Sequence, residues 1–267
     1  MILIFFLCSG GFSAERVVLL ELFTSSTCGP CFFANSYLDT TYSSEDENVS
    51  LIRYHVWWPA PGNDPFYLAN PYPNRARVNF YNIDAVPTLV VDGGVRDESY
   101  TAWGMIIEAR RSLPSPVELY AYMSEFGRAR IKITANESFQ TGSQRLFFVI
   151  VEDSIRYNAP NGQRIFHQVM REMFPNSTGK LVFVAAGETT GTELDYYIKP
   201  EWNEDNIHAV IFLQNEFSKE VYQSVKVSLP PRPEYAFYVN VPMSKAFVAA
   251  GDSVVLPFTV VNTGSSV

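Results

Sequence analysis

The sequence predicts an α/β domain, then an antiparallel β-sandwich of the immunoglobulin type, then the start of a third β module. Strand-like apolar runs alternate with helix-like segments as far as residue 113. After the Pro-containing stretch 113–116 the apolar residues recur at every second position, which is the period of a half-buried strand. A second Pro-rich stretch at 230–234 precedes two further strand-like runs. These changes of pattern divide the chain.

The composition is that of a folded protein and disfavours nucleic acid as a partner. Its 267 residues fit two domains with residues left over, and the 47% hydrophobic content supplies packed cores. Lys and Arg number 20 against 28 Asp and Glu, which gives a formal net charge of −8. No basic stripe stands out, so the electrostatics do not favour a phosphate backbone.

Residues 1–14 are interpreted as a secretory signal peptide. The apolar run from Met1 to Leu7 is followed by small residues. It falls far short of the roughly 20 apolar residues of a membrane-spanning helix. No Lys or Arg precedes the run, so a buried first strand stays open as the alternative. If the segment is removed, Cys8 is removed with it, and Cys28 and Cys31 are the only remaining cysteines.

The first domain, 15–113, is expected to contain two-sided buried strands and surface helices. Trp57 and its aromatic neighbours in the insertion either line a peptide groove or form a small core of their own, and we expect the core. The expected elements are a strand at 16–23, a helix at 32–42, a strand at 49–56, an irregular insertion at 57–73, a short helix at 74–81, a strand at 86–91, a turn at 92–94 and a helix at 100–111.

The second domain, 116–229, is predicted to be a sandwich of about seven strands. Residues 166–174 form a helical or extended excursion inside it. Residues 230–234 are a stiff linker, and 235–267 are either a truncated β module or an interaction tail. The strands are expected at 117–122, 130–134, 146–151, 181–185, 209–213 and 220–227, with two more around 237–241 and 254–261.

The sequence Cys28-Gly29-Pro30-Cys31 carries the chemistry. A cysteine at the first turn of a helix meets unpaired backbone N–H groups and the positive end of the helix dipole, which favour the thiolate. Pro30 suits a helix start because no N–H donor is needed there. Cys31 lies one turn further along, within bonding distance of Cys28. The spacing therefore predicts thiol–disulfide exchange, with Cys28 attacking and Cys31 resolving.

Zinc is the main alternative for a Cys-x-x-Cys pair. A structural zinc site needs a second pair of ligands, and His55, His167 and His208 are isolated with no ligand spacing. We therefore expect no metal.

Together with Val86-Pro87-Thr88 downstream, this motif resembles the thioredoxin superfamily, whose order of elements the first domain also follows. The resemblance implies that Pro87 is the cis-proline packed beside the cysteines, although an ordinary edge-strand proline is the alternative. It also implies that Val86 and Pro87, with Gly29 and Pro30, contact the substrate.

The sequence departs from the thioredoxin pattern. Thr27 replaces the tryptophan before the first cysteine, and Ser36 replaces the helix-kinking proline. Leu22 occupies the position of the buried acid, while Glu21 points to the opposite face of the strand. The missing acid leaves Cys31 without an evident base and predicts a slow or specialised exchanger.

A closer resemblance, covering most of the chain, is to the outer-membrane-protein-related thioredoxin-like proteins and lipoproteins of gram-negative bacteria. It implies export to the periplasm, outer membrane or cell surface, with peripheral outer-membrane association as one arrangement. The segments that carry it are 21–31, 63–67, 77–86, 167–171 and 202–221.

The expected function is exchange of disulfides with envelope proteins, in a reductase or isomerase direction that the sequence leaves open. The partners are protein or peptide disulfides and an electron donor or acceptor of unknown identity. No cofactor is expected besides the Cys28–Cys31 disulfide. The alternative is a non-catalytic binding or assembly protein that uses the fold as a scaffold.

Overall fold

The computed structural model describes residues 14–42, 46–97, 99–124, 127–136, 139, 142–231, 237–240, 259–262 and 264. The helices are α1 (Gly29–Thr41), α2 (Pro65–Ala69), α3 (Pro71–Tyr81), α4 (Tyr100–Arg111) and the 3-10 turn η1 (Glu204–Asn206). The strands are β1 (Val18–Thr24), β2 (Val49–His55), β3 (Thr88–Val91), β4 (Val95–Asp97), β5 (Val117–Ser124), β6 (Arg128–Ala135), β7 (Gln144–Glu152), β8 (Ile155–Arg156), β9 (Ile165–Phe166), β10 (Val169–Phe174), β11 (Lys180–Val182), β12 (Thr189–Asp195), β13 (Ile207–Asn215), β14 (Val221–Ser228), β15 (Phe237–Asn240) and β16 (Thr259–Asn262).

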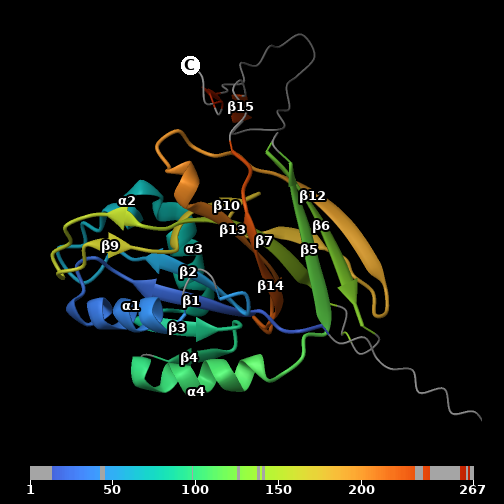
Figure 1. Ribbon diagram of the computed structural model, residues 1–267, viewed down its shortest axis with the longest axis horizontal. Helices are drawn as coiled ribbons and strands as arrows, with labels where there is room; N and C mark the ends of the chain where they lie inside the picture. The colour runs from blue at the N-terminus through green and yellow to red at the C-terminus, as the bar shows by residue number, and fades with distance from the viewer. Residues whose placement is uncertain are drawn as a thin grey trace, which may run out of the picture.

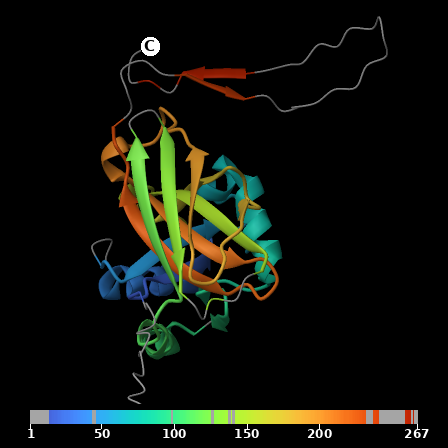
Figure 2. The same cartoon turned by 90° about the vertical axis from the view of Figure 1, so that its right-hand side faces the viewer.

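One nine-stranded sheet runs through the molecule (Figure 1). Its order is β14-β13-β7-β10-β2-β1-β3-β4, with β11 also paired to β7. β1 is parallel to β2 and antiparallel to β3. β10 joins the sheet parallel to β2, where Val169 is the partner of Arg53 and the Arg53 N–H donates to the Gln168 carbonyl at 2.8 Å. A separate three-stranded sheet, β12-β6-β5, faces the viewer in Figure 2.

The predicted elements of residues 15–113 match the structure closely. The strand, helix, strand, insertion, strand, turn, strand, helix order of the thioredoxin fold is present, from β1 to α4. α1 begins at Gly29, three residues earlier than expected, because Cys28 caps it. The insertion contains a helix, α2, whose Phe66 and Tyr67 are buried. Trp57 lies 5.4 Å from the Tyr67 ring but also packs against the core on the α3 side, and Phe66 packs with Phe166 of β9. The aromatic side chains of the insertion therefore join larger clusters and do not form a core of their own.

The separate immunoglobulin-like sandwich expected over 116–229 is not confirmed. β7, β10, β13 and β14 continue the sheet of the first half, and only β5, β6 and β12 form a second layer. The physical reason lies in β7, where the run 146–151 is apolar at every position and buried on both faces. A strand of a free sandwich has one face toward water and alternates. The 166–174 excursion is extended, and it supplies β9 and β10.

Two layers cover opposite faces of the large sheet. α1 and α4 pack on one face of β1 through Leu20, Leu22 and Trp103, and α3 packs on the other face through Val78. Further along the sheet, Phe148 faces the three-stranded layer, and the alternate positions of β7 face the α3 side. Figure 1 shows α1 and α4 on one side of β1 and β3, with α3 on the other. Because successive side chains of a strand point to opposite faces, β7 contributes to both the core under the three-stranded layer and the core under α3.

A buried ion pair in the first half of the chain is hydrogen-bonded to the second half through Gln214. Glu21 on β1 and Arg77 on α3 are 0% and 1% exposed, with Nη2 and Oε1 2.5 Å apart. Burial by itself lowers the pKa of Arg77, but the Glu21 carboxylate raises it above the ordinary value. Arg77 Nη1 also donates to Gln214 on β13 at 3.0 Å, and Tyr81 donates to Glu21 at 2.6 Å. Glu21 therefore does point away from the Leu22 face.

The remaining predicted segments fall largely outside the described residues. Residues 1–13 of the expected signal peptide and most of 232–267 are among them. Ala14 forms a β-bridge with Ser115. β15 and β16 pair antiparallel, near two of the strands expected in the third module. No helix of the described residues is long and apolar enough to cross a membrane.

Candidate redox site

The cysteine pair lies where β1 ends and α1 begins. After Thr24 the chain makes a tight turn, in which the Cys28 N–H donates to the Ser25 carbonyl at 3.2 Å. Cys28 is the N-cap of α1 with extended backbone angles, and its Sγ accepts the Cys31 N–H at 3.2 Å. A sulfur in this position is held at the amide end of a helix, where negative charge is stabilised.

Cys28 and Cys31 are joined by a disulfide, with their Cα atoms 5.3 Å apart. Cys28 is 2% exposed and Cys31 is 0% exposed. Gly29 and Pro30 between them are exposed. The two sulfurs therefore lie within bonding distance, as the spacing predicts, and both are almost completely buried.

The Val86–Pro87 peptide bond is cis and lies beside the cysteines. The Val86 carbonyl oxygen is 3.6 Å from Cys28 Sγ, so a Cys28 thiol in the reduced form is placed to donate to it. Val86 is half-buried and Pro87 is buried. The structure thus brings Cys28, Cys31 and Val86 together, with Pro87 immediately after Val86.

A buried carboxylate that the sequence analysis did not identify supports the cysteine turn. Asp64 accepts the Ser26 N–H at 2.6 Å and lies 2.7 Å from His55 Nδ1 through the same oxygen, Oδ2. Its Oδ1 accepts the N–H groups of Phe66 and Tyr67, which caps α2. The signal was present in the sequence, since an Asp followed by Pro is a helix N-cap signature. The sequence did not indicate that this carboxylate also binds the cysteine turn through Ser26.

His55 ends β2 directly beside Thr24, the last residue of β1. Its imidazole is 1% exposed and packs against the Phe66 and Phe166 rings, with centroids 4.7 and 5.9 Å away. Nε2 has no hydrogen-bond partner among the described residues. Asp64 therefore connects a buried imidazole to the turn that carries Cys28.

We expect the free energy of unfolding to fall at acidic pH because Asp64 becomes protonated. Burial by itself raises the pKa of this carboxyl, but His55 and the Ser26 and Tyr67 N–H groups lower it from 3.8 to about 2. Because the folded-state pKa is the lower one, the ionised carboxyl stabilises the fold above about pH 4. This contribution, about 2 kcal/mol, is lost as the pH falls toward 2.

Urea unfolding of the wild type and of Asp64→Asn between pH 2 and pH 7 measures this contribution. The wild type should be the more stable at neutral pH, and the difference should shrink by about 2 kcal/mol on acidification. Other carboxyls titrate equally in both proteins and cancel. A difference that does not depend on pH would contradict the assignment.

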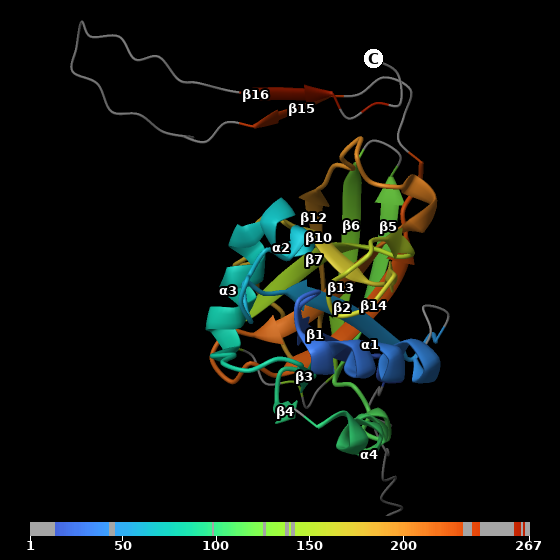
Figure 3. The same ribbon diagram turned by 90° about the vertical axis from the view of Figure 1, so that its left-hand side faces the viewer.

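A hairpin from the second half of the chain also reaches the cysteine turn. The Asn161 side-chain Nδ2 donates to the carbonyl oxygens of Cys28 and Ser25 at 3.1 and 3.3 Å. Gln163 Oε1 accepts a hydrogen bond at 3.0 Å from Nδ2 of Asn35, which lies on α1 one helical turn after Cys31. In Figure 3 β8 and β9, which form this hairpin, are drawn in yellow near α1. Sequence reasoning had no signal for contacts between residues 133 positions apart.

No family model matches the sequence, and no curated protein matches it. Solved structures do match. HBP35 of Porphyromonas gingivalis superposes with a TM-score of 0.67 at 14% identity, covering 96% of each chain. The chain shares the fold of HBP35.

A second match is a protein from Agrobacterium tumefaciens, with a TM-score of 0.56 and 15% identity over 80% of this chain and 94% of that one. A domain of the outer membrane lipoprotein Omp28 from Porphyromonas gingivalis covers 44% of this chain and 91% of its own at 14% identity. Its TM-score of 0.29 is too low to support an argument. At these identities the matches establish the fold and not the activity.

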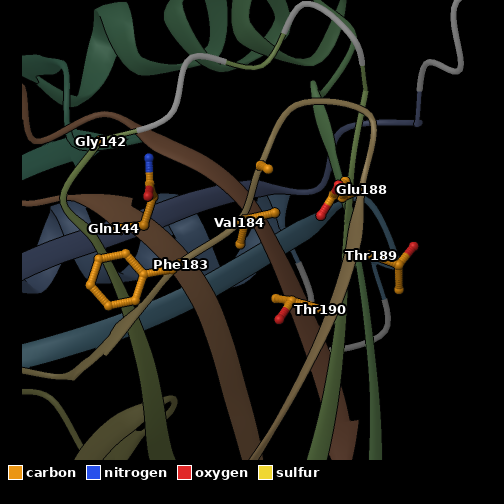
Figure 4. A pocket seen from close by; sticks show the side chains of 8 residues that line it. Gly142, Gln144, Phe183, Val184, Glu188, Thr189 and Thr190 are labelled. Carbon is orange, nitrogen blue, oxygen red and sulfur yellow. The ribbon is translucent and has the colours of Figure 1, made fainter.

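An open hollow of about 380 Å³ lies apart from the cysteines, next to the start of β7 and the segment from β11 to β12. Figure 4 shows Gln144, Phe183 and Glu188 around it, with Thr189 and Thr190 on β12. None of the predicted site residues lines it. The candidate site is therefore the cysteine turn, which is not a deep cavity.

Proposed function

We propose that this protein is an exported thiol–disulfide oxidoreductase that exchanges disulfides with envelope proteins through Cys28. The observation that carries the proposal is the Cys28–Cys31 disulfide at the amide end of α1, beside the cis Val86–Pro87 bond. A structural bridge has no need of this placement, whereas a nucleophilic sulfur does.

In the reducing direction the reaction has two steps. The Cys28 thiolate attacks one sulfur of a client disulfide, forming a mixed disulfide and releasing the other client sulfur as thiolate. The Cys31 thiolate then attacks the Cys28 sulfur, which frees the second client thiolate and forms the Cys28–Cys31 bond. Two electrons pass to the client, and an external thiol donor restores the dithiol. The oxidising direction is the reverse.

The chain's own groups serve defined purposes in these steps. The Cys31 N–H, 3.2 Å from Cys28 Sγ, stabilises the thiolate of Cys28. The exposed Gly29 and Pro30 and the half-buried Val86 form the surface that meets the client. Pro87 fixes the direction of the Val86 carbonyl. No cofactor beyond the disulfide takes part in this proposal, and no nucleic acid.

A scaffold function is the second candidate, and one observation favours it. With Cys28 only 2% exposed, the disulfide is shielded as a purely structural bridge would be. In that case the fold presents a surface for envelope assembly, and the bridge stabilises the start of α1. The resemblance to exported outer-membrane-related proteins supports an envelope location, either periplasmic or on the outer membrane, for both candidates.

Reduction of a disulfide-bonded client protein such as insulin, with dithiothreitol as donor, tests the enzyme against the scaffold. We expect turnover by the wild type and none above background for Cys28→Ser. Absence of wild-type turnover would favour the scaffold. The reduction potential then gives the direction, because values near −270 mV are typical of reductants and values near about −120 mV of oxidants.

A further inference from the structure

The hairpin that reaches the cysteine turn is ordered by its own hydrogen bonds. It consists of β8, β9 and the connecting loop 157–164. Across the loop, the Tyr157 N–H donates to the Arg164 carbonyl at 3.1 Å and the Ala159 N–H to the Gln163 carbonyl at 3.0 Å. Gly162 has a φ of +95°, in the region that favours glycine, and completes the turn. Asn161 therefore lies at the tip of a defined structure.

Asn161 attaches the tip to the cysteine turn through three hydrogen bonds. Besides its two side-chain bonds, Asn161 donates its backbone N–H to the Ser26 carbonyl at 3.2 Å. On the other side of the same turn, the Thr27 hydroxyl donates to the Pro59 carbonyl at 3.1 Å. The turn that carries Cys28 is thus held between the hairpin tip and the insertion.

The base of the hairpin is attached differently. Phe166 on β9 is buried, and its ring centroid lies 4.6 Å from that of Phe66. Tyr157 contacts the same Phe66 ring at 5.8 Å. Apolar burial of this kind is stronger than the few partly buried hydrogen bonds of Asn161, so the tip can detach while the base stays in place.

We propose that Asn161 is a positioning residue for Cys28, and that the hairpin tip selects among thiols by size. With the tip in place, Cys28 is almost completely buried, and an attacking sulfur must approach along the line of the disulfide bond. A small thiol needs less room for this approach than a peptide does. Detachment of the tip opens the turn and releases the Cys28 carbonyl from its donor. The proposal rests on the proposed function.

The test is the rate at which the Cys28–Cys31 disulfide of the full chain is reduced, measured by alkylation of the freed thiols. Dithiothreitol is the small probe and reduced glutathione the large one. We expect glutathione to reduce the wild-type disulfide more slowly, relative to dithiothreitol, than the intrinsic reactivities of the two thiols predict. Asn161→Ala should raise the glutathione rate about tenfold, equivalent to about 1.4 kcal/mol, and the dithiothreitol rate much less.

Asn158→Ala is the matched control. Asn158 lies in the same loop, is exposed, and accepts only from Arg164 Nη1 at 2.7 Å in the contacts described. Its rates should equal those of the wild type. Asn161→Leu keeps a side chain of similar size without a charge and has no N–H to donate, so it should behave like Asn161→Ala.

Equal glutathione-to-dithiothreitol rate ratios in the wild type and both Asn161 variants would overturn the proposal. These rates need no client turnover, so they separate the two ideas. If the wild type does not reduce insulin but the glutathione-to-dithiothreitol rate ratio changes in the Asn161 variants, the proposed enzyme function is wrong and the size selection by the tip is supported. If the wild type reduces insulin and the rate ratio does not change, the enzyme function is supported and the size selection is wrong.

Discussion

Cys31→Ser should accumulate a covalent complex with its client. In this variant Cys28 still attacks a client disulfide, but no second sulfur is present to break the mixed disulfide. Turnover should fall to the uncatalysed rate, while a client-sized increase in mass appears on a non-reducing gel. The Cys31 backbone N–H, which donates to Cys28 Sγ, is retained in the variant, so activation of Cys28 is preserved.

The control is the double variant with serine at both positions, which should form no complex. Dithiothreitol should dissolve the complex of the single variant. If Cys31→Ser traps nothing while Cys28→Ser does trap a client, the roles of the two cysteines are reversed. The capping geometry argues against that outcome, because Cys28 and not Cys31 lies at the amide end of α1.

Arg77→Met should have the largest effect on stability. The substitution leaves the Glu21 carboxylate buried with no cation, and breaking a buried ion pair from one side costs about 3–5 kcal/mol. It also removes the hydrogen bond from Arg77 to Gln214 on β13. The midpoint of urea unfolding should therefore fall strongly, with α3 and β13 losing their protection from hydrogen exchange first.

Arg96→Met is the matched control, because it removes the same type of side chain from a surface pair with Asp84. Exposed pairs contribute little, so this variant should unfold as the wild type does. Adding Glu21→Leu to Arg77→Met should recover much of the loss, since the buried charge is then gone. Equal unfolding midpoints for Arg77→Met and Arg96→Met would show that the buried pair has no special role.

The sequence predicted the first half of the fold better than the second. Between β1 and α4 the order of the elements was predicted correctly, because β1 and β3 are continuous apolar runs and the strands and helices alternate along the chain. The starts of α1 and α3 and the helix α2 were missed. In the second half the local pattern identified strands but not their neighbours. The continuous apolar character of 146–151 and 209–213 was the signal in the sequence, because a strand that is apolar at every position is covered on both faces.

The candidate site shows the same division. Cys28 and Cys31 belong to a short motif at a helix start, so their spacing located them, whereas the position of Pro87 beside them came from the resemblance to the thioredoxin superfamily. Asp64 acts through tertiary contacts that its own N-cap signature does not reveal. Asn161 was invisible, because nothing in the loop 157–164 specifies that it folds back onto a turn near the other end of the chain.

The pairing of β2 with β10 joins the two halves of the chain within one sheet. If the chain ended at residue 113, Arg53 on β2 would lose the backbone carbonyl groups of His167 and Gln168 that it now binds, and β2 would be left unpaired at that position. The half that carries the cysteines and the β-rich remainder therefore share one sheet, and we expect neither half alone to be as stable as the intact chain.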